Sequence, residues 1–278
     1  MKLEKKIVRC VLFARVVILI VTAVAASLIP VAVHAETILY GITGGGDLYE
    51  IDKAVGNGTF IGSSGFEANA AASDSQNRII TGGGSGADAD RLVRVNPNTG
   101  AGSVYSKLVN RPGGYSIRGL AFNSSDELFA LMSKSGLSAI DILTTIDTTT
   151  GQVSLVGADG QTGMTNIQGL AFGASGRLWG VAGGELVGIN PSTAVASTIG
   201  GSNISPDGQA LEVDMDGTLF SARYNLKTLD AFGNASLVGA IGDVDIRGLA
   251  IVPEPASFYL LVLGGIVALG YGIGARRA

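Results

Sequence analysis

The chain is nearly without the side chains that most metal, redox and nucleophilic sites require. Its 278 residues include a single cysteine, Cys10, and a single histidine, His34. Both lie in an N-terminal stretch that we expect to be removed, so the mature protein would carry neither a thiol nor an imidazole. This excludes disulfides, Cys/His zinc sites, haem or iron–sulfur ligation, and Ser-His-Asp or Cys-His catalysis, because each needs at least one of these side chains.

Positive charge is also scarce. Residues 1–35 hold five basic and one acidic residue, and residues 253–278 hold two basic and one acidic residue. The remaining residues, 36–252, keep 12 basic and 21 acidic residues, a net charge of −9. Because neutralised phosphates supply most nucleic-acid affinity, this composition argues against DNA or RNA as a partner.

The N-terminus has the three parts of a secretory signal peptide. A basic region ends at Arg15, an apolar run covers Val16 to Val33, and Val33-His34-Ala35 precedes Glu36. Small residues at the −1 and −3 positions predict cleavage by signal peptidase between Ala35 and Glu36, so residues 1–35 are expected to be a signal helix. An uncleaved membrane anchor is the alternative, because about 18 apolar residues approach the length that spans a bilayer.

The C-terminus combines a short proline motif with an apolar stretch and terminal arginines. Pro253-Glu254-Pro255 is followed by twenty uncharged residues, Ala256 to Ala275, and then by Arg276 and Arg277. The length predicts a transmembrane helix, and the arginines would stay on the cytoplasmic side. An ordinary tail anchor would explain the helix and the charges, but not the proline motif.

This order of elements resembles the PEP-CTERM sorting signal of bacterial exosortase substrates, over residues 253–278. The resemblance implies that a membrane exosortase recognises Pro253-Glu254-Pro255 and removes the helix. It also implies transient anchoring in the inner membrane. Release or attachment would then follow at the cell surface or in the extracellular matrix of a Gram-negative, exopolysaccharide-producing bacterium.

The chain between the two ends is a repeat. Ile117–Phe122, Ile167–Phe172 and Ile246–Ile251 are near copies of one apolar segment, and Ala68–Ser73 and Gly208–Val213 are weaker copies. Each of the first four copies along the chain is followed by a second short strand. A third strand that begins at a leucine occurs five times. These leucines (Leu48, Leu92, Leu143, Leu186 and Leu226) are 44, 51, 43 and 40 residues apart. Four short strands in each period of this length are typical of a β-propeller blade.

The two ends of the repeat predict a closed ring. The last inner strand, Ile246–Ile251, has no second strand after it, while the first strand, Ile38–Ile42, has no inner strand before it. We therefore predict an all-β, five-bladed β-propeller over residues 36–252, closed by pairing the N- and C-terminal strands, with blades starting near residues 37, 67, 116, 166 and 208. An open β-sandwich is the alternative, because regularly spaced strands suit it too.

The repeated segment also predicts how the blades pack. Alternate residues of a strand face opposite sides, so Leu120 and Phe122 would contact one neighbouring blade while Gly119 and Ala121 leave room on the other. The order of strand types is similar to secreted propellers of the NHL and gluconolactonase-like kind, over about residues 37–252. These families include lactonases, lyases, peptide binders and scaffolds, so the similarity does not select a function.

A polar residue precedes the small residue of each inner strand. In a closed ring these positions would lie at one height, so we expect a polar ring at one mouth of the central channel. Arginine and carboxamides there would suit an anionic or carbohydrate ligand. Polar lining of a water-filled channel is the alternative. The five residues are Asn69, Arg118, Gln168, Gln209 and Arg247.

Carboxylates are the second set of candidates. Glu212 replaces the alanine of the stronger repeats, and Asp214 and Asp216 follow it closely, so these three are weak candidates for a Ca²⁺ site or for general-base chemistry. None of the acidic pairs continues into an EF-hand loop, and acidic residues commonly cap turns. We assign no catalytic residue and no cofactor from the sequence.

We therefore expect an exported, exosortase-processed binding or scaffold protein of the cell surface or matrix, with a polysaccharide or surface protein as its partner. The alternative is a propeller hydrolase or lyase that uses the channel carboxylates with a divalent cation.

Overall fold

The computed structural model describes residues 36–84, 86–134, 139–205 and 208–254. The expected signal helix with Ala35, and the expected transmembrane helix with Pro255, Arg276 and Arg277, lie outside these ranges. Within them, no helix is long and apolar enough to cross a membrane.

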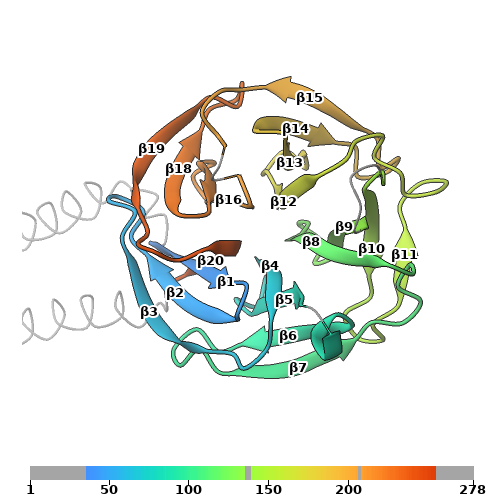
Figure 1. The fold of residues 1–278 in the computed structure, drawn as a ribbon, viewed down its shortest axis with the longest axis horizontal. Helices are drawn as coiled ribbons and strands as arrows, with labels where there is room; N and C mark the ends of the chain where they lie inside the picture. Colours follow the sequence, from blue (N-terminus) through green and yellow to red (C-terminus); the bar gives the residue numbers. More distant parts are fainter. Residues whose placement is uncertain (1–35, 85, 135–138, 206–207, 255–278) are drawn as a thin grey trace, which may run out of the picture. The chain divides into compact units, whose positions relative to one another are not determined.

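The described chain forms five four-stranded sheets arranged around an axis (Figure 1). From the axis outward the sheets run β4-β5-β6-β7, β8-β9-β10-β11, β12-β13-β14-β15, β16-β17-β18-β19 and β20-β1-β2-β3, with every neighbouring pair antiparallel. Besides the strands there is one 3-10 turn, η1 (Gly86–Asp88), in the described ranges. The strands are β1 (Thr37–Thr43), β2 (Asp47–Ile51), β3 (Gly58–Ser63), β4 (Ala68–Ser73), β5 (Ile79–Gly83), β6 (Arg91–Val95), β7 (Gly102–Lys107), β8 (Tyr115–Phe122), β9 (Leu128–Lys134), β10 (Ile142–Ile146), β11 (Val153–Leu155), β12 (Ile167–Phe172), β13 (Leu178–Ala182), β14 (Glu185–Ile189), β15 (Ala196–Gly200), β16 (Ala210–Val213), β17 (Leu219–Ala222), β18 (Asn225–Leu229), β19 (Ala235–Ala240) and β20 (Ile246–Pro253).

The ring closes on its own two ends, as the repeat predicts. β20 is the inner strand of a blade whose outer strands are β1 to β3, and Thr37 lies opposite Pro253 in the ladder. The backbone N–H of Glu254 also donates to the carbonyl of Glu36 over 2.8 Å. All twenty strands and all five core clusters of the described chain lie within residues 36–254. This fragment therefore contains the five blades, and each inner strand is paired with a second strand.

The blades pack large side chains against small ones, which confirms the expected use of the repeated segment. Leu120 and Phe122 join the core with Ala70 and Ala72 of the preceding blade. On the other side of β8, a Cβ at Gly119 would lie only 2.8 Å from that of Leu170. Glycine is needed at such positions because the inner strands approach one another closely near the axis.

The third strand of each blade carries the leucine that defines the repeat, and this leucine is buried in the core. The side chains of these five residues, which lie in β2, β6, β10, β14 and β18, are at most 1% exposed. Tight turns then connect the third strand to the fourth. In one of them, Asp147 accepts hydrogen bonds from the backbone N–H groups of Thr149 and Thr150, and Gly151 follows at a φ of 75°. Such turns explain part of the high glycine content.

Candidate functional site

The five inner strands, β4, β8, β12, β16 and β20, give the ring two distinct faces. Each inner strand begins on one face, which we call the entry face, and ends on the opposite face, which we call the exit face. Equivalent residues of all five strands meet around the axis, where Gly119, Gly169 and Gly248 allow the backbones to approach. The predicted polar residues sit at the beginnings of these strands and hence belong to the entry face.

The axis itself is tightly packed just below this face. The cavity there has about 140 Å³ of empty volume and no space for a water molecule, and a Cβ at Gly248 would lie 2.2 Å from the amide nitrogen of Ala71. A water-filled channel at this level is therefore not what the structure shows. Arg118 and Arg247 line this cavity, so two of the five predicted ring residues meet at the axis.

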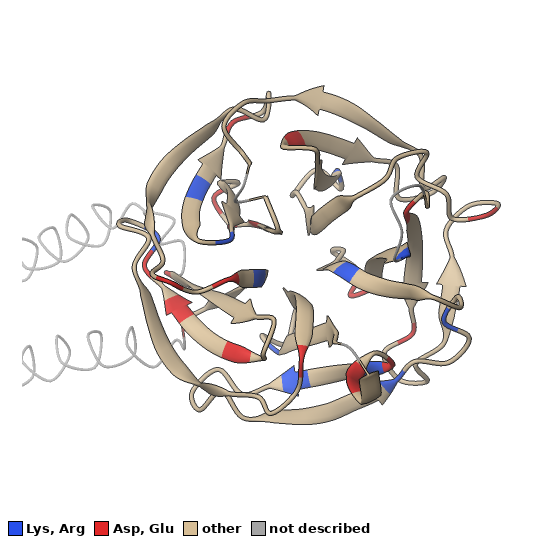
Figure 2. Ribbon diagram, in the orientation of Figure 1, with Lys and Arg blue, Asp and Glu red and all other residues tan. Residues whose placement is uncertain are grey.

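Basic residues lie on the inner strands β8 and β20, close to the axis, although residues 36–252 as a whole are acidic (Figure 2). Arg247 and Arg223 each donate through Nε to Asp245, over 2.9 Å in both cases. Within the described residues, the guanidinium of Arg118 makes no ion pair. Burial raises the pKa of Asp141, and the charge of Arg118 acts in the opposite direction. Two arginines on the entry face thus share the carboxylate of Asp245.

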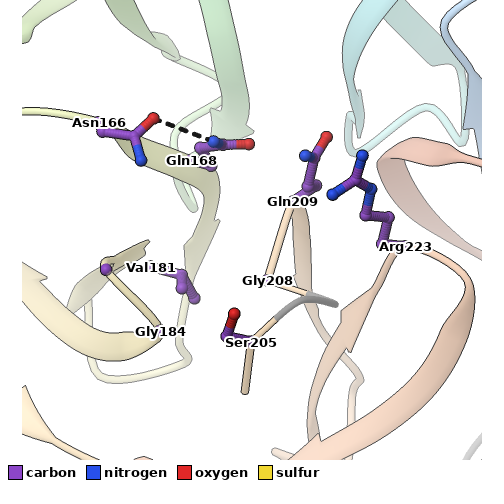
Figure 3. Close-up of a pocket in the computed structure, with 9 residues that line it drawn as sticks. Asn166, Gln168, Val181, Gly184, Ser205, Gly208, Gln209 and Arg223 are labelled. Carbon is purple, nitrogen blue, oxygen red and sulfur yellow. Dashed lines mark hydrogen bonds between the residues drawn. The ribbon is translucent and has the colours of Figure 1, made fainter. Parts of the chain in front are cut away.

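A pocket of about 310 Å³ opens beside the axis, between the blades β12–β15 and β16–β19. Figure 3 shows Asn166 and Gln168 on one side, and Gln209 and Arg223 on the other, with Ser205 lower in the cleft. The Nε2 of Gln168 donates to Oδ1 of Asn166 over 3.1 Å. Gln168 and Gln209 are two further members of the predicted ring, and they lie on opposite walls of this pocket.

Gln209 has an unusual environment. Its Oε1 is buried and accepts no hydrogen bond from the part of the chain that the structure describes. A buried carbonyl oxygen without a donor costs about 1–3 kcal/mol. Because Oε1 is shielded from solvent, a ligand hydroxyl in the pocket would reach it only after the Gln209 side chain turns, and the new hydrogen bond would then recover this free energy.

The fifth ring residue, Asn69, does not join either group. Its Nδ2 donates to the carbonyl of Gly83 in the neighbouring strand β5. The ladder between β4 and β5 shifts register between Ala68 and Ala70, so Asn69 occupies the irregular position. Asn69 therefore satisfies its own blade and lines neither the axial cavity nor the pocket.

The three carboxylates proposed as weak metal candidates lie away from the pocket. Asp214, at the exit end of β16, accepts from Thr37 Oγ1 and from Lys53 Nζ, each over 2.7 Å, which ties this blade to β1 and β2. Asp216 accepts from the backbone N–H of Thr218, a contact that lowers its pKa. Among the described residues, no group of three or more His, Cys, Asp or Glu side chains is placed to hold a metal ion.

Glu212 is the most perturbed carboxyl of the described chain. It lies opposite Phe220 in the ladder, at the position that Ala121 and Ala171 hold in their blades. Burial, together with the charge of Asp214, raises its pKa to about 8, although a hydrogen bond from the amide of Val213 acts in the opposite direction. This carboxyl is therefore mostly protonated at neutral pH.

Sequence reasoning missed Arg223, Asn166 and Ser205 as pocket residues. Arg223 directly follows the second strand of its blade, and an antiparallel second strand ends where the inner strand begins. Counting strand ends would have placed its backbone on the entry face. Nothing in the repeat pattern marks Asn166 or Ser205, because both lie in the irregular connections that precede inner strands.

Comparison with known proteins yields likeness in fold only. No family model matches the chain, and no curated protein matches it. A solved structure from work on the de novo evolutionary emergence of a symmetrical protein is 15% identical, with a TM-score of 0.50 over 79% of this chain and 100% of that one.

Two further solved structures are similar to this chain. A gluconolactonase from Xanthomonas campestris is 16% identical, with a TM-score of 0.47 over 77% of this chain and 79% of that one. A calcium-binding protein, regucalcin, from Agrobacterium tumefaciens is 16% identical, with a TM-score of 0.46 over 73% of this chain and 69% of that one. At these identities the comparisons assign no function, which has to be argued from the site.

Proposed function

We propose that the propeller is a binding module for acidic oligosaccharides, and that the entry-face pocket holds one or two sugar units. The observation that carries this proposal is Gln209: its side chain lines a pocket otherwise furnished with amide, hydroxyl and guanidinium groups, and its buried Oε1 has no hydrogen-bond donor among the described residues. Sugar hydroxyl groups donate and accept hydrogen bonds. A carboxamide can pair with them through both its N–H donor and its carbonyl acceptor. The pocket volume lies at the lower end of the range for small-molecule sites.

The charges at the mouth favour a carboxylate or sulfate on the ligand. Arg223 donates through Nε to Asp245, its guanidinium carbon lies 4.7 Å from the centre of the Tyr224 ring, and 25% of its side chain remains exposed. A guanidinium can hold a carboxylate through two parallel hydrogen bonds. A uronate unit in the pocket would therefore use Arg223 for its charge and the two glutamines for its hydroxyls.

The test is isothermal titration calorimetry of residues 36–254 with digalacturonate as the probe. Arg223→Ala should weaken binding at least tenfold, which corresponds to the loss of about 1.4 kcal/mol. Arg94→Ala is the charge-matched control, because Arg94 is exposed on β6 of another blade, and it should leave the affinity unchanged. Equal loss in both variants would show only general charge attraction and would end the pocket assignment.

Export and sorting are part of the same proposal. A ligand site for acidic polysaccharide suits a protein that is secreted after cleavage at Ala35 and then processed by exosortase at Pro253-Glu254-Pro255, at the cell surface or in the matrix. The test is a strain that lacks exosortase, in which the protein should accumulate as a larger form that keeps its C-terminal helix. Equal size and location in both strains would remove the sorting claim.

A hydrolase remains the second candidate, because Glu212 has a property that general acids need. A carboxyl that stays protonated near neutral pH can donate its proton to a leaving group. The expected partner, Asp214, is held by Lys53 and Thr37, and the described carboxylates do not gather into a calcium site. We therefore place no catalytic step through a metal.

The two candidates are distinguished by incubating residues 36–254 with digalacturonate and with aldonolactones, with and without Ca²⁺. Binding without turnover supports the binding module. Turnover that Glu212→Gln abolishes and Glu185→Gln leaves intact would establish the hydrolase, since Glu185 is an exposed residue of β14. Calorimetry with Ca²⁺, and thermal unfolding with and without chelator, test the metal directly.

A further inference from the structure

A second pocket lies on the exit face, between the same two blades and independent of the site above. Its volume is about 300 Å³, and it is bounded by the ends of β12 and β16 and by the turns that follow β16 and β18. Most of its walls are apolar. They are formed chiefly by Trp179, Leu186, Val213, Leu219, Leu229 and Ala231.

The repeat shows what occupies the equivalent place at the preceding blade boundary. Phe172 of β12 lies opposite Leu178 in its ladder, and Val213 of β16 lies opposite Leu219 in the same register. In the second strands, Phe129 lies opposite Ala121, and Trp179 lies opposite Ala171. The pair Phe129 and Phe172 is therefore equivalent to the pair Trp179 and Val213.

At the preceding boundary the two rings touch. Phe172 packs edge-to-face against Phe129, with centroids 5.1 Å apart and planes inclined by 70°. At the next boundary valine replaces phenylalanine, and Trp179 has no aromatic ring against it among the residues that the structure describes. Arg177 covers the indole instead, with its guanidinium carbon 4.7 Å from the ring centroid. The pocket thus lies beside the position at which a phenyl ring stands one blade earlier.

We propose that this exit-face pocket binds one six-membered aromatic ring of a small ligand, packed against Trp179. The apolar walls supply the burial that such a ring needs, and aromatic pairs favour the edge-to-face arrangement seen one blade earlier. Asp230 is the one acidic or basic side chain that lines the pocket. Because the other lining side chains are uncharged, a neutral ring such as that of a phenol fits this pocket.

Trp179 makes the proposal directly measurable, because it is the only tryptophan of the whole chain. Titration of residues 36–254 with p-cresol should change its emission with a dissociation constant of about 1 mM, as expected for so small a ligand. No change up to the solubility limit of p-cresol would overturn the proposal.

Variants of Val213 locate the binding. Val213→Phe restores the missing ring and should abolish the p-cresol response while raising the melting temperature. Val213→Ala enlarges the pocket and should keep the response, which covers the case in which the phenylalanine variant does not fold. A response in a folded Val213→Phe protein that equals the unsubstituted one would show that p-cresol binds elsewhere.

A ring from a second copy of the chain is the competing occupant of this pocket. Phe232 is 72% exposed and directly follows Ala231, which lines the pocket. A second copy of the chain could insert this ring. If Trp179 emission depends on protein concentration without ligand, and Phe232→Ala removes that dependence, the pocket is a self-association site and the small-ligand proposal is wrong. Concentration-independent emission in both proteins supports the proposal.

Discussion

Glu212→Gln should stabilise the propeller, increasingly so as the pH rises. The folded protein raises the pKa of Glu212 from 4.5 to about 8, so it holds the proton more tightly than the unfolded chain does. A group of this kind costs nothing below pH 4.5, and its cost grows until pH 8, above which the folded carboxyl is also ionised. Stability of the unsubstituted protein should therefore fall as the pH rises through this window.

The magnitude follows from the pKa. At about 1.36 kcal/mol per pH unit, the difference would cost about 5 kcal/mol above pH 8 and about 3 kcal/mol at pH 7. Because the Glu212 side chain is only half-buried by its exposed area, solvent screens part of this, and we expect about 2 kcal/mol at pH 7. For a domain of this size that is a rise of roughly 4–8 °C in melting temperature.

The assay is urea unfolding of residues 36–254 at pH 5, 7 and 8.5, with Glu212→Gln beside Glu185→Gln. Glu185 is an exposed residue on β14, so its variant serves as the matched control. The stability gain of Glu212→Gln should be small at pH 5 and largest at pH 8.5. A gain that does not change with pH, or a loss at all three values, would refute the reasoning from burial.

Two further predictions concern how the ring is held together. Asp214→Asn should lower the free energy of unfolding by about 1–3 kcal/mol, because it leaves Lys53 without its carboxylate, and a double-mutant cycle with Lys53→Met measures the coupling; additive effects would deny that the pair matters. Gly248→Ala should destabilise by more than about 2 kcal/mol in thermal unfolding, since the new Cβ would lie 2.2 Å from the backbone of Ala71, whereas Gly113→Ala, in open space, should stay within about 0.5 kcal/mol. Equal stability of these two glycine variants would contradict the packing described at the axis.

The repeat carried enough information to predict the fold. The five leucines of the third strands and the copies around Gly119, Gly169 and Gly248 fixed the number of blades, because each copy has to bury the same apolar face against its neighbours. The unpaired strands at the two ends then required closure. These features depend on strand period and chain order, which can be read directly from the residues.

The site was predicted only in part, because residue height on a strand does not set side-chain direction. Arg118 and Arg247 meet at the axis, but Asn69 turns to the carbonyl of Gly83 at a register shift. Arg223 reaches the pocket from a loop that the repeat does not describe. The exchange of Phe172 for Val213 is visible in the aligned segments, but the pocket that it leaves depends on how the blades meet.

The most direct test of the central claim is the affinity of Gln209→Leu for digalacturonate, measured by calorimetry beside the unsubstituted residues 36–254. The substitution keeps the size of the side chain and removes the unpartnered oxygen on which the proposed sugar site depends. We predict at least a tenfold loss of affinity together with unchanged or higher thermal stability, since a buried polar atom without a partner is removed. Binding of equal strength in both proteins would contradict the assignment of the entry-face pocket as the ligand site.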